Sequence, residues 1–167
     1  MGLALKKEER YTYRDYLTWP DEESWEIING EAYNMSPAPK VTHQNVAGNL
    51  YIRLRTSPEN ACYTGIAPTD VVFDEYNVVQ PDVFVVCDRA KITEDNIQGA
   101  PDLIVEVISP NTEVKDKREK KDIYERFGVR EYIIVYPERE YIERFSLVGD
   151  RYNGPEIFNW DEIISLK

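Results

Sequence analysis

The stretch that decides the fold reads Pro101-Asp102-Leu103-Ile104-Val105-Glu106-Val107-Ile108-Ser109. Glu106 is the only charged residue between Leu103 and Ile108. Side chains of a strand alternate between its two faces, and strands at the centre of a sheet are apolar on both. We therefore predict a central strand over residues 103–108, with Glu106 buried on the face that carries Ile104 and Ile108.

The segment after this strand, from about Val114 to Phe127, has the periodicity of an amphipathic helix. At about 100° per residue, Lys120 falls within the apolar stripe and Lys121 points away from it. The stripe consists of Ile123, Tyr124 and Phe127. Removing an ammonium group from water costs several kcal/mol unless it is paired. The sequence therefore predicts an anionic group beneath Lys120.

The elements around this unit indicate an α/β protein. The expected elements are a short helix from Thr12 to Leu17, a hairpin around Asn29-Gly30, a helix ending at Ser57-Pro58, and strands near 62–65, 71–73, 83–87, 103–108, 132–136 and 142–147. The strand, helix, strand unit from Leu103 to Tyr136 would bring its two strands into one sheet. From this pattern we predict an α/β fold with a central mixed sheet flanked by helices.

The composition of the 167 residues is that of one soluble domain, which we expect to span 1–167. The longest apolar runs are of strand length, far below the roughly 20 residues that cross a bilayer, so no membrane association is expected. Residues 1–10 lack the apolar core of a signal peptide. Cys62 and Cys87 form no CxxC pair, which predicts neither a disulfide framework nor a zinc site and favours a reducing cytoplasm.

The formal net charge of −11 argues against broad nonspecific binding to nucleic acid. The charge is uneven, however: residues 113–130 hold seven basic and five acidic side chains and are the only net-positive stretch. A polyanion would most easily border on this helix. The alternative is a solvated helix face on which Lys115, Lys117, Arg118 and Lys121 pair with Glu113, Glu119, Asp122 and Glu125.

Asp82 opens the apolar run after Gln80-Pro81, as Glu106 interrupts the later one. Two neighbouring carboxylates repel each other unless a proton or a cation separates them. Mg²⁺ or Mn²⁺ would resolve this, since hard cations prefer oxygen ligands, and Lys120 could then hold a water or stabilise charge on a phosphate. Each residue also has an ordinary alternative: a turn for Asp82, an edge position for Glu106 and an extended lysine for Lys120.

Several motifs together resemble the Uma2 family of endonucleases, also called DUF820. They are Gly30-Glu31, His43-Gln44, Pro81-Asp82, Glu106-Val107-Ile108-Ser109-Pro110, the four-residue spacing of Asp116, Lys120 and Tyr124, and Gly128-Val129-Arg130-Glu131-Tyr132-Ile133-Ile134-Val135. The resemblance extends from Tyr13 to about Phe145. It implies the restriction-endonuclease-like PD-(D/E)XK fold, a central mixed sheet flanked by helices with a divalent-metal nuclease site.

The resemblance also implies roles for individual residues. Asp82 matches the aspartate of the motif and Glu106 its second acid. The usual lysine two positions later is Ile108 here, which implies that Lys120 takes its place from the following helix. Glu31 resembles the additional acid that such nucleases carry on an early element, although it could equally be an exposed strand residue.

The predicted function is hydrolysis of DNA phosphodiester bonds, leaving a 5′-phosphate and a 3′-hydroxyl as the resemblance implies. Asp82, Glu106 and the Val107 carbonyl would bind Mg²⁺ or Mn²⁺, with Glu31 completing the site. His43, Gln44, Lys117 and Lys121 are candidate substrate contacts, while His43 could instead cap or pack a helix. Asp116 would be a partner of Lys120 one turn away, and Tyr124 a core aromatic residue.

Two other functions fit the same sequence. A non-catalytic binding module could use the acidic surface for a protein partner, and a phosphoesterase for a small nucleotide would need the same site chemistry. No P-loop or dinucleotide fingerprint occurs. Because cutting both strands of DNA generally needs two active sites, a homodimer is expected.

Overall fold

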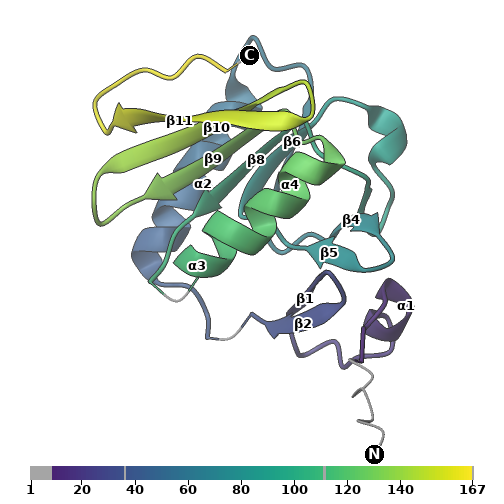
Figure 1. Ribbon diagram of the computed structural model, residues 1–167. Helices are drawn as coiled ribbons and strands as arrows, with labels where there is room; N and C mark the ends of the chain where they lie inside the picture. The colour runs from purple at the N-terminus through teal and green to yellow at the C-terminus, as the bar shows by residue number, and fades with distance from the viewer. Residues whose placement is uncertain (1–8, 36, 111, 167) are drawn as a thin grey trace, which may run out of the picture.

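The structure, a computed structural model, describes residues 9–35, 37–110 and 112–166 and contains two mixed sheets (Figure 1). The larger has the order β11-β10-β9-β8-β6-β3 and the smaller the order β2-β1-β5-β4-β7. The larger comprises β3 (Tyr63–Ile66), β6 (Val83–Val86), β8 (Leu103–Val107), β9 (Glu131–Tyr136), β10 (Tyr141–Val148) and β11 (Arg151–Asn159). The predicted α/β class with a central mixed sheet is confirmed.

One parallel pair lies at the centre of the large sheet. β8 runs parallel to β9, with Glu106 opposite Ile134, and the other neighbouring strands of this sheet are antiparallel. A parallel pair needs a crossover connection. The helical segment between the two strands provides it, as α3 (Glu113–Lys115), a π-helix η2 (Asp116–Lys120) and α4 (Lys121–Phe127).

Helices cover both faces of the large sheet, with α2 (Val41–Thr56) on one side and α4 on the other (Figure 1). The face toward α2 is mainly apolar: its buried hydrophobic residues, which pack against Ala47 of α2, are Val83, Val85, Leu103, Val105, Val107, Ile133 and Val135. The strand register also places three buried polar or charged residues on this face, namely Thr64, Glu131 and Arg144. The opposite face carries Ile104, Ile134 and Tyr132, on which Tyr124 of α4 packs, and it also carries Glu106. The alternation predicted for β8 is therefore observed, with Glu106 only 3 % exposed.

The smaller sheet begins with the predicted hairpin. It comprises β1 (Trp25–Ile28), β2 (Glu31–Asn34), β4 (Val71–Asp74), β5 (Asn77–Val79) and β7 (Ile97–Gln98). Asn29 and Gly30 both have positive φ, as a type I′ turn requires. Two of its strands were not predicted, because three residues in β5 and two in β7 are too few to show an alternating pattern.

Two short helices lie outside the sheets. α1 (Tyr13–Tyr16) begins after Thr12, which forms a capping box with Asp15, as a helix starting at Thr12 predicts. η1 (Arg89–Lys91) follows β6. In the described ranges, no helix has the length and apolar character needed to cross a bilayer.

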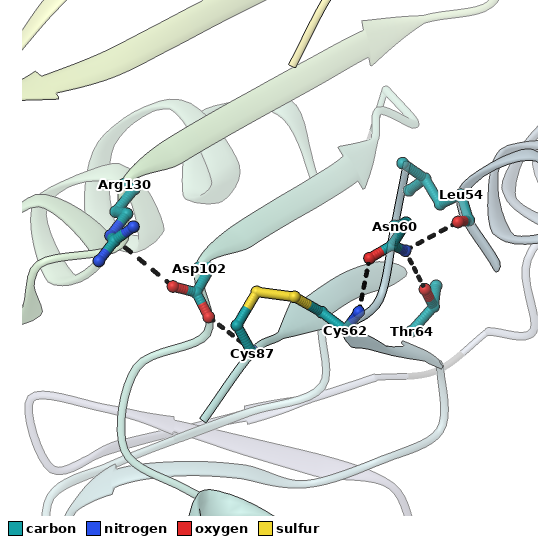
Figure 2. Close-up of a disulfide and its surroundings, with 7 residues drawn as sticks. All are labelled: Leu54, Asn60, Cys62, Thr64, Cys87, Asp102 and Arg130. Carbon is teal, nitrogen blue, oxygen red and sulfur yellow. Dashed lines mark hydrogen bonds and ion pairs between the residues drawn. A yellow bond between two sulfur atoms is a disulfide. The ribbon is translucent and has the colours of Figure 1, made fainter. Parts of the chain in front are cut away.

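The expectation that the two cysteines form no disulfide is wrong. Cys62 and Cys87 are bonded, with their Cα atoms 4.5 Å apart, because β3 and β6 pair and place the two residues at the same end. Figure 2 shows the Cys62 amide donating to Asn60 at 3.0 Å and the Cys87 amide donating to Asp102 at 2.8 Å. The observation that favoured a reducing compartment is thereby removed.

Candidate functional site

Lys120 lies at the centre of a buried charge cluster. Its side chain is 2 % exposed, and Nζ is 2.8 Å from Glu26 Oε1 and 2.9 Å from Glu106 Oε1. Asp116 Oδ1, one turn earlier in the helix, is 3.5 Å away. The anionic group predicted beneath Lys120 is therefore present, and three carboxylates share this role.

The π-helix η2 brings Asp116 and Lys120 to the same buried side. The sequence predicted an uninterrupted helix from about 114 to 127, whereas the structure has a five-residue π segment between α3 and α4. The Asp116 carbonyl accepts a hydrogen bond from the Tyr132 hydroxyl at 2.9 Å, so β9 supports this segment from below. A π segment inside a helix is frequent at functional sites.

Glu26, on β1, is the acidic residue of this cluster that the sequence analysis missed. It is fully buried, and its carboxylate binds both Lys120 and Lys115, the latter at 2.8 Å through Oε2. The backbone amide of Gln80 donates to the Glu26 carboxylate at 2.9 Å. A signal was present, because Glu26 interrupts an apolar strand just as Glu106 does.

Glu31, predicted as the additional acid, is located differently. It is exposed on β2 and accepts a hydrogen bond from the Tyr33 hydroxyl at 2.8 Å. In the hairpin register Glu31 pairs with Ile28, at the turn end, whereas Glu26 lies two residues earlier on β1. Glu26 is therefore the acid of this hairpin that reaches the cluster, and the expected role of Glu31 at the metal site stays a prediction.

Glu106 connects the lysine to the strand. Its Oε1 accepts hydrogen bonds from Lys120 and from the Tyr124 hydroxyl, the latter at 2.8 Å. Tyr124 is thus a hydrogen-bonding residue of the cluster as well as the core aromatic residue expected. Burial raises the pKa of Glu106 well above its ordinary value; the charge of Lys120 opposes this shift, and those of Asp116 and Asp82 add to it.

The two basic groups of the cluster act on its acids through charge. Burial alone would lower the pKa of Lys120, but Glu106, Glu26 and Asp116 outweigh burial and raise this pKa well above its usual value. Burial would likewise raise the pKa of Glu26, yet Lys120 and Lys115 outweigh it and lower that pKa. Lys120 is therefore protonated, and Glu26 is its ionised partner.

Asp82 lies beside Glu106 at the start of β6. Its Oδ2 accepts a hydrogen bond from the Val107 amide at 2.7 Å, and its own amide is 3.4 Å from Glu106 Oε2. Asp82 is only partly buried, with 18 % of its side chain exposed. The two acids of the motif thus come together, one deep in the protein and one open to solvent.

His43 on α2 reaches the same place from the other face of the sheet. Its Nε2 is 3.2 Å from Asp82 Oδ2, and its Nδ1 is 3.3 Å from Oε1 of the exposed Gln44. The hydrogen bond to Asp82 raises the pKa of His43, against the effect of burial. The structure thus shows His43 in contact with Asp82. A direct contact of His43 with substrate stays a prediction.

The helix lysines divide into inner and outer ones. Lys115, considered above as a possible surface lysine, binds Glu26 and is 15 % exposed. Lys117 Nζ is instead 3.8 Å from Glu143 and faces the Tyr136 ring, and Lys121 Nζ lies 4.8 Å from the centre of the Phe145 ring. Lys117 and Lys121 are thus outside the cluster, along the same helix.

The carboxylates of Asp82 and Glu106 are the groups of this site that could hold a divalent ion. Over the described part of the chain, no group of three or more His, Cys, Asp or Glu side chains is arranged to hold a metal. Asp82 and Glu106 do offer two adjacent carboxylates, with the Val107 backbone beside them. Mg²⁺ is commonly bound by one or two carboxylates together with water and substrate phosphate, and these residues fit that pattern.

The fold is of the restriction-endonuclease-like class, a central mixed sheet flanked by helices. A crystal structure described as "a putative nuclease belonging to DUF820 from Anabaena variabilis ATCC 29413" superposes with a TM-score of 0.76 over 93 % of this chain and 89 % of the other, at 17 % sequence identity. The chain belongs to the Uma2 family, described as "Putative restriction endonuclease", whose model matches residues 13–167. A search of curated proteins finds no match.

Proposed function

We propose that this protein is a metal-dependent endonuclease that hydrolyses phosphodiester bonds of DNA. The observation that carries the proposal is a fully buried lysine whose ammonium group lies 2.9 Å from Glu106, the acid that adjoins Asp82. A buried ion pair is seldom needed for stability alone, because well-packed apolar residues often serve as well. The membership in the Uma2 family supports the same function.

Asp82, Glu106 and the Val107 carbonyl are the residues that would hold Mg²⁺ or Mn²⁺. The bound ion would supply Lewis-acid stabilisation of a phosphate oxygen and a more acidic water. The Val107 amide fixes Asp82 at 2.7 Å, and Tyr124 fixes Glu106 at 2.8 Å, so neither acid must reorganise before it binds. His43 contacts the same oxygen of Asp82, Oδ2, at 3.2 Å.

Lys120 would provide the positive charge that orients the attacking water and stabilises the phosphate as its charge grows. Glu26 and Asp116 hold this ammonium in place, and Lys115 offsets the second oxygen of Glu26. Glu26 is thus a positioning residue.

Lys117 and Lys121 lie on the same helix with more exposed side chains, and we propose that they contact the phosphate backbone beside the site, with Gln44 at its opposite rim. Hydrolysis would leave a 5′-phosphate and a 3′-hydroxyl. Cutting both strands would need a second site, which a homodimer would supply. Sedimentation of the protein with and without a DNA duplex would test the dimer.

The direct test is cleavage of circular DNA in the presence of Mg²⁺ or Mn²⁺ by the wild type and by Asp82→Asn. The variant keeps the shape of the side chain but removes a metal-binding charge, so we expect at least about a hundredfold loss of cleavage. Asp150→Asn, in the exposed turn after β10, is the matched control and should cleave normally. Equal cleavage by wild type and Asp82→Asn would refute the proposal.

Binding of the ion can be tested apart from cleavage. A ligand that binds only the folded protein raises its stability, by about 2.7 kcal/mol at a hundred times its Kd. The midpoint of thermal unfolding should therefore rise with Mg²⁺ or Mn²⁺ in the wild type and much less in Asp82→Asn. A non-catalytic binding module would show no such difference.

A further inference from the structure

A second feature of the molecule is a pocket of about 360 Å³ whose lining includes Gln80, the residue whose backbone amide donates to Glu26 of the charge cluster. It lies between Tyr63 at the start of β3, the loop before β4 and the segment before β7. Its size is at the lower end of the roughly 300–1,000 Å³ of small-molecule sites. Its polar lining includes Tyr63, Asp70, Gln80, Glu94, Asp95 and Asn96.

The inner wall of the pocket is fixed by hydrogen bonds. Asp70 Oδ1 accepts from the Tyr16 hydroxyl and from Gln80 Nε2, both at 2.9 Å. Asn96 donates to the Tyr13 hydroxyl at 2.8 Å. The two tyrosines of α1 thus hold the wall in place, so the pocket is preorganised for a ligand.

The charges of the lining restrict what can bind. Three carboxylates line the pocket and no lysine or arginine does, so a phosphate group would be repelled. The described residues also offer no cluster of three metal-binding side chains. A ligand that suits this pocket is uncharged or cationic and presents N–H groups to acceptor oxygens.

The free hydrogen-bonding groups are mainly acceptors. With Asp70 Oδ1 occupied by Tyr16 and Gln80, the other oxygen of Asp70 remains for a ligand, as do the carboxylates of Asp95 and Glu94; none of these oxygens has a hydrogen-bond partner among the described residues. Tyr63, 40 % exposed on the edge strand β3, offers an aromatic face. Base stacking on such a ring is favourable for any nucleobase.

We propose that this pocket binds a guanine base of the nucleic-acid substrate. Guanine presents adjacent ring N–H and amino donors, which two carboxylate oxygens can accept together, whereas thymine presents one N–H between two carbonyl oxygens that carboxylates repel. Adenine and cytosine present an amino group beside a ring acceptor and are expected to bind with intermediate strength.

The pocket is connected to the proposed active site through Gln80. The side chain of Gln80 donates to Asp70, while the backbone amide of Gln80 donates to Glu26 at 2.9 Å. The Ala67 amide, next to Pro68 of the pocket wall, donates to the Asp82 carbonyl at 3.0 Å. A guanine in the pocket would therefore lie beside the scissile phosphate, a placement that rests on the proposed nuclease function.

The test measures binding of 2′-deoxyguanosine and thymidine to the full chain without metal, by following backbone amide signals in NMR titrations. We expect deoxyguanosine to bind at least about tenfold more tightly and to shift signals of residues 93–97. Tyr63→Ala and Asp95→Asn should each weaken it about fivefold or more, and Asp150→Asn should not. Because Tyr63 and Asp95 have partly or fully exposed side chains, both variants should fold.

Three results would overturn the proposal: no shifts in the pocket, equal binding of the two nucleosides, or binding of arginine amide in place of deoxyguanosine. The last would indicate a basic protein partner. Cleavage plays no part in the measurement. A protein that binds deoxyguanosine but cuts no DNA refutes only the nuclease, and one that cuts DNA without binding deoxyguanosine refutes only the base pocket.

Discussion

The two faces of the large sheet differ in the side chains that are buried against their helices. Toward α2, the strands present mostly valine, leucine and isoleucine side chains around Ala47, and the buried polar groups on this face belong to Thr64, Glu131 and Arg144. Toward η2 and α4, the same strands present Glu106 and support Lys120 and Asp116, all less than 4 % exposed. Strand β8 contributes to both, because its residues alternate between the faces.

The face toward α2 mainly stabilises the fold, whereas the face toward η2 and α4 builds the candidate site. The apolar face gains stability simply by removing hydrocarbon from water. The charged face contributes to stability only while each buried charged side chain keeps its partner, because an unpaired buried charge is costly. Four experiments, in order of decreasing expected effect, can separate these two behaviours.

Lys120→Ala should have the largest effect on stability. It leaves Glu26, Glu106 and Asp116 without their shared cation, and we expect a loss of about 3–5 kcal/mol in the free energy of unfolding by denaturant. Burial raises the pKa of Glu106, so this carboxylate can take up a proton and the loss should be smaller at pH 5 than at pH 8. Lys121→Ala, outside the apolar stripe, should cost about 0.5 kcal/mol or less. Equal losses would contradict the assignment of Lys120.

Leu103→Ala tests the apolar face. The side chain is 6 % exposed, and its truncation should cost about 2–4 kcal/mol through lost burial and the cavity left behind. In contrast to Lys120→Ala, the loss should be the same at pH 5 and pH 8. Ile52→Ala on α2, 56 % exposed, is the control and should change stability little. A loss that depends on pH would show that the two faces are not independent.

Reduction of the Cys62–Cys87 disulfide should affect both faces alike. The bond joins residues 25 apart in the sequence, and its removal should lower the free energy of unfolding by about 2–3 kcal/mol. The check is denaturant unfolding of the wild type with and without a reducing agent. A double variant, Cys62→Ser with Cys87→Ser, should be insensitive to the reductant; if the wild type is equally insensitive, the bond contributes nothing.

The smallest expected effect is a shift in the pKa of His43, the α2 residue that contacts Asp82. It is the only histidine, so its ring signals in NMR titrate alone. The hydrogen bond to Asp82 raises the pKa of His43, so the midpoint should lie above 6.5 and move toward 6.5 in Asp82→Asn. The stabilisation from this pair is present below pH 6.5 and is lost as the pH rises through the raised pKa. An unchanged midpoint in Asp82→Asn would rule out the contact.

Much of the charged face could be predicted from single residues. Glu106 is a charge inside an apolar strand, and Lys120 is a charge inside an apolar helical stripe, so each violates a local pattern. Two violations of opposite sign on adjacent elements predicted the ion pair. Asp116 followed from its distance of one helical turn.

The missed features depend on contacts between distant parts of the chain. Glu26 reaches the cluster because β1 pairs with β5, a three-residue strand that no alternation reveals. The disulfide likewise depends on the pairing of β3 with β6. The π-helix escaped prediction because one additional residue per turn over five residues barely changes the apolar pattern.

The most direct test of the nuclease site is cleavage of circular DNA with Mg²⁺ by Glu106→Gln. Glutamine has nearly the shape of glutamate and its carbonyl oxygen can still accept from Tyr124, so the fold should survive, which circular dichroism can verify. We expect Glu106→Gln to lose cleavage by at least about a hundredfold. Glu138→Gln is the control, because the Glu138 side chain is 70 % exposed, and it should cleave normally. Cleavage by Glu106→Gln at the wild-type rate would contradict the proposed nuclease site.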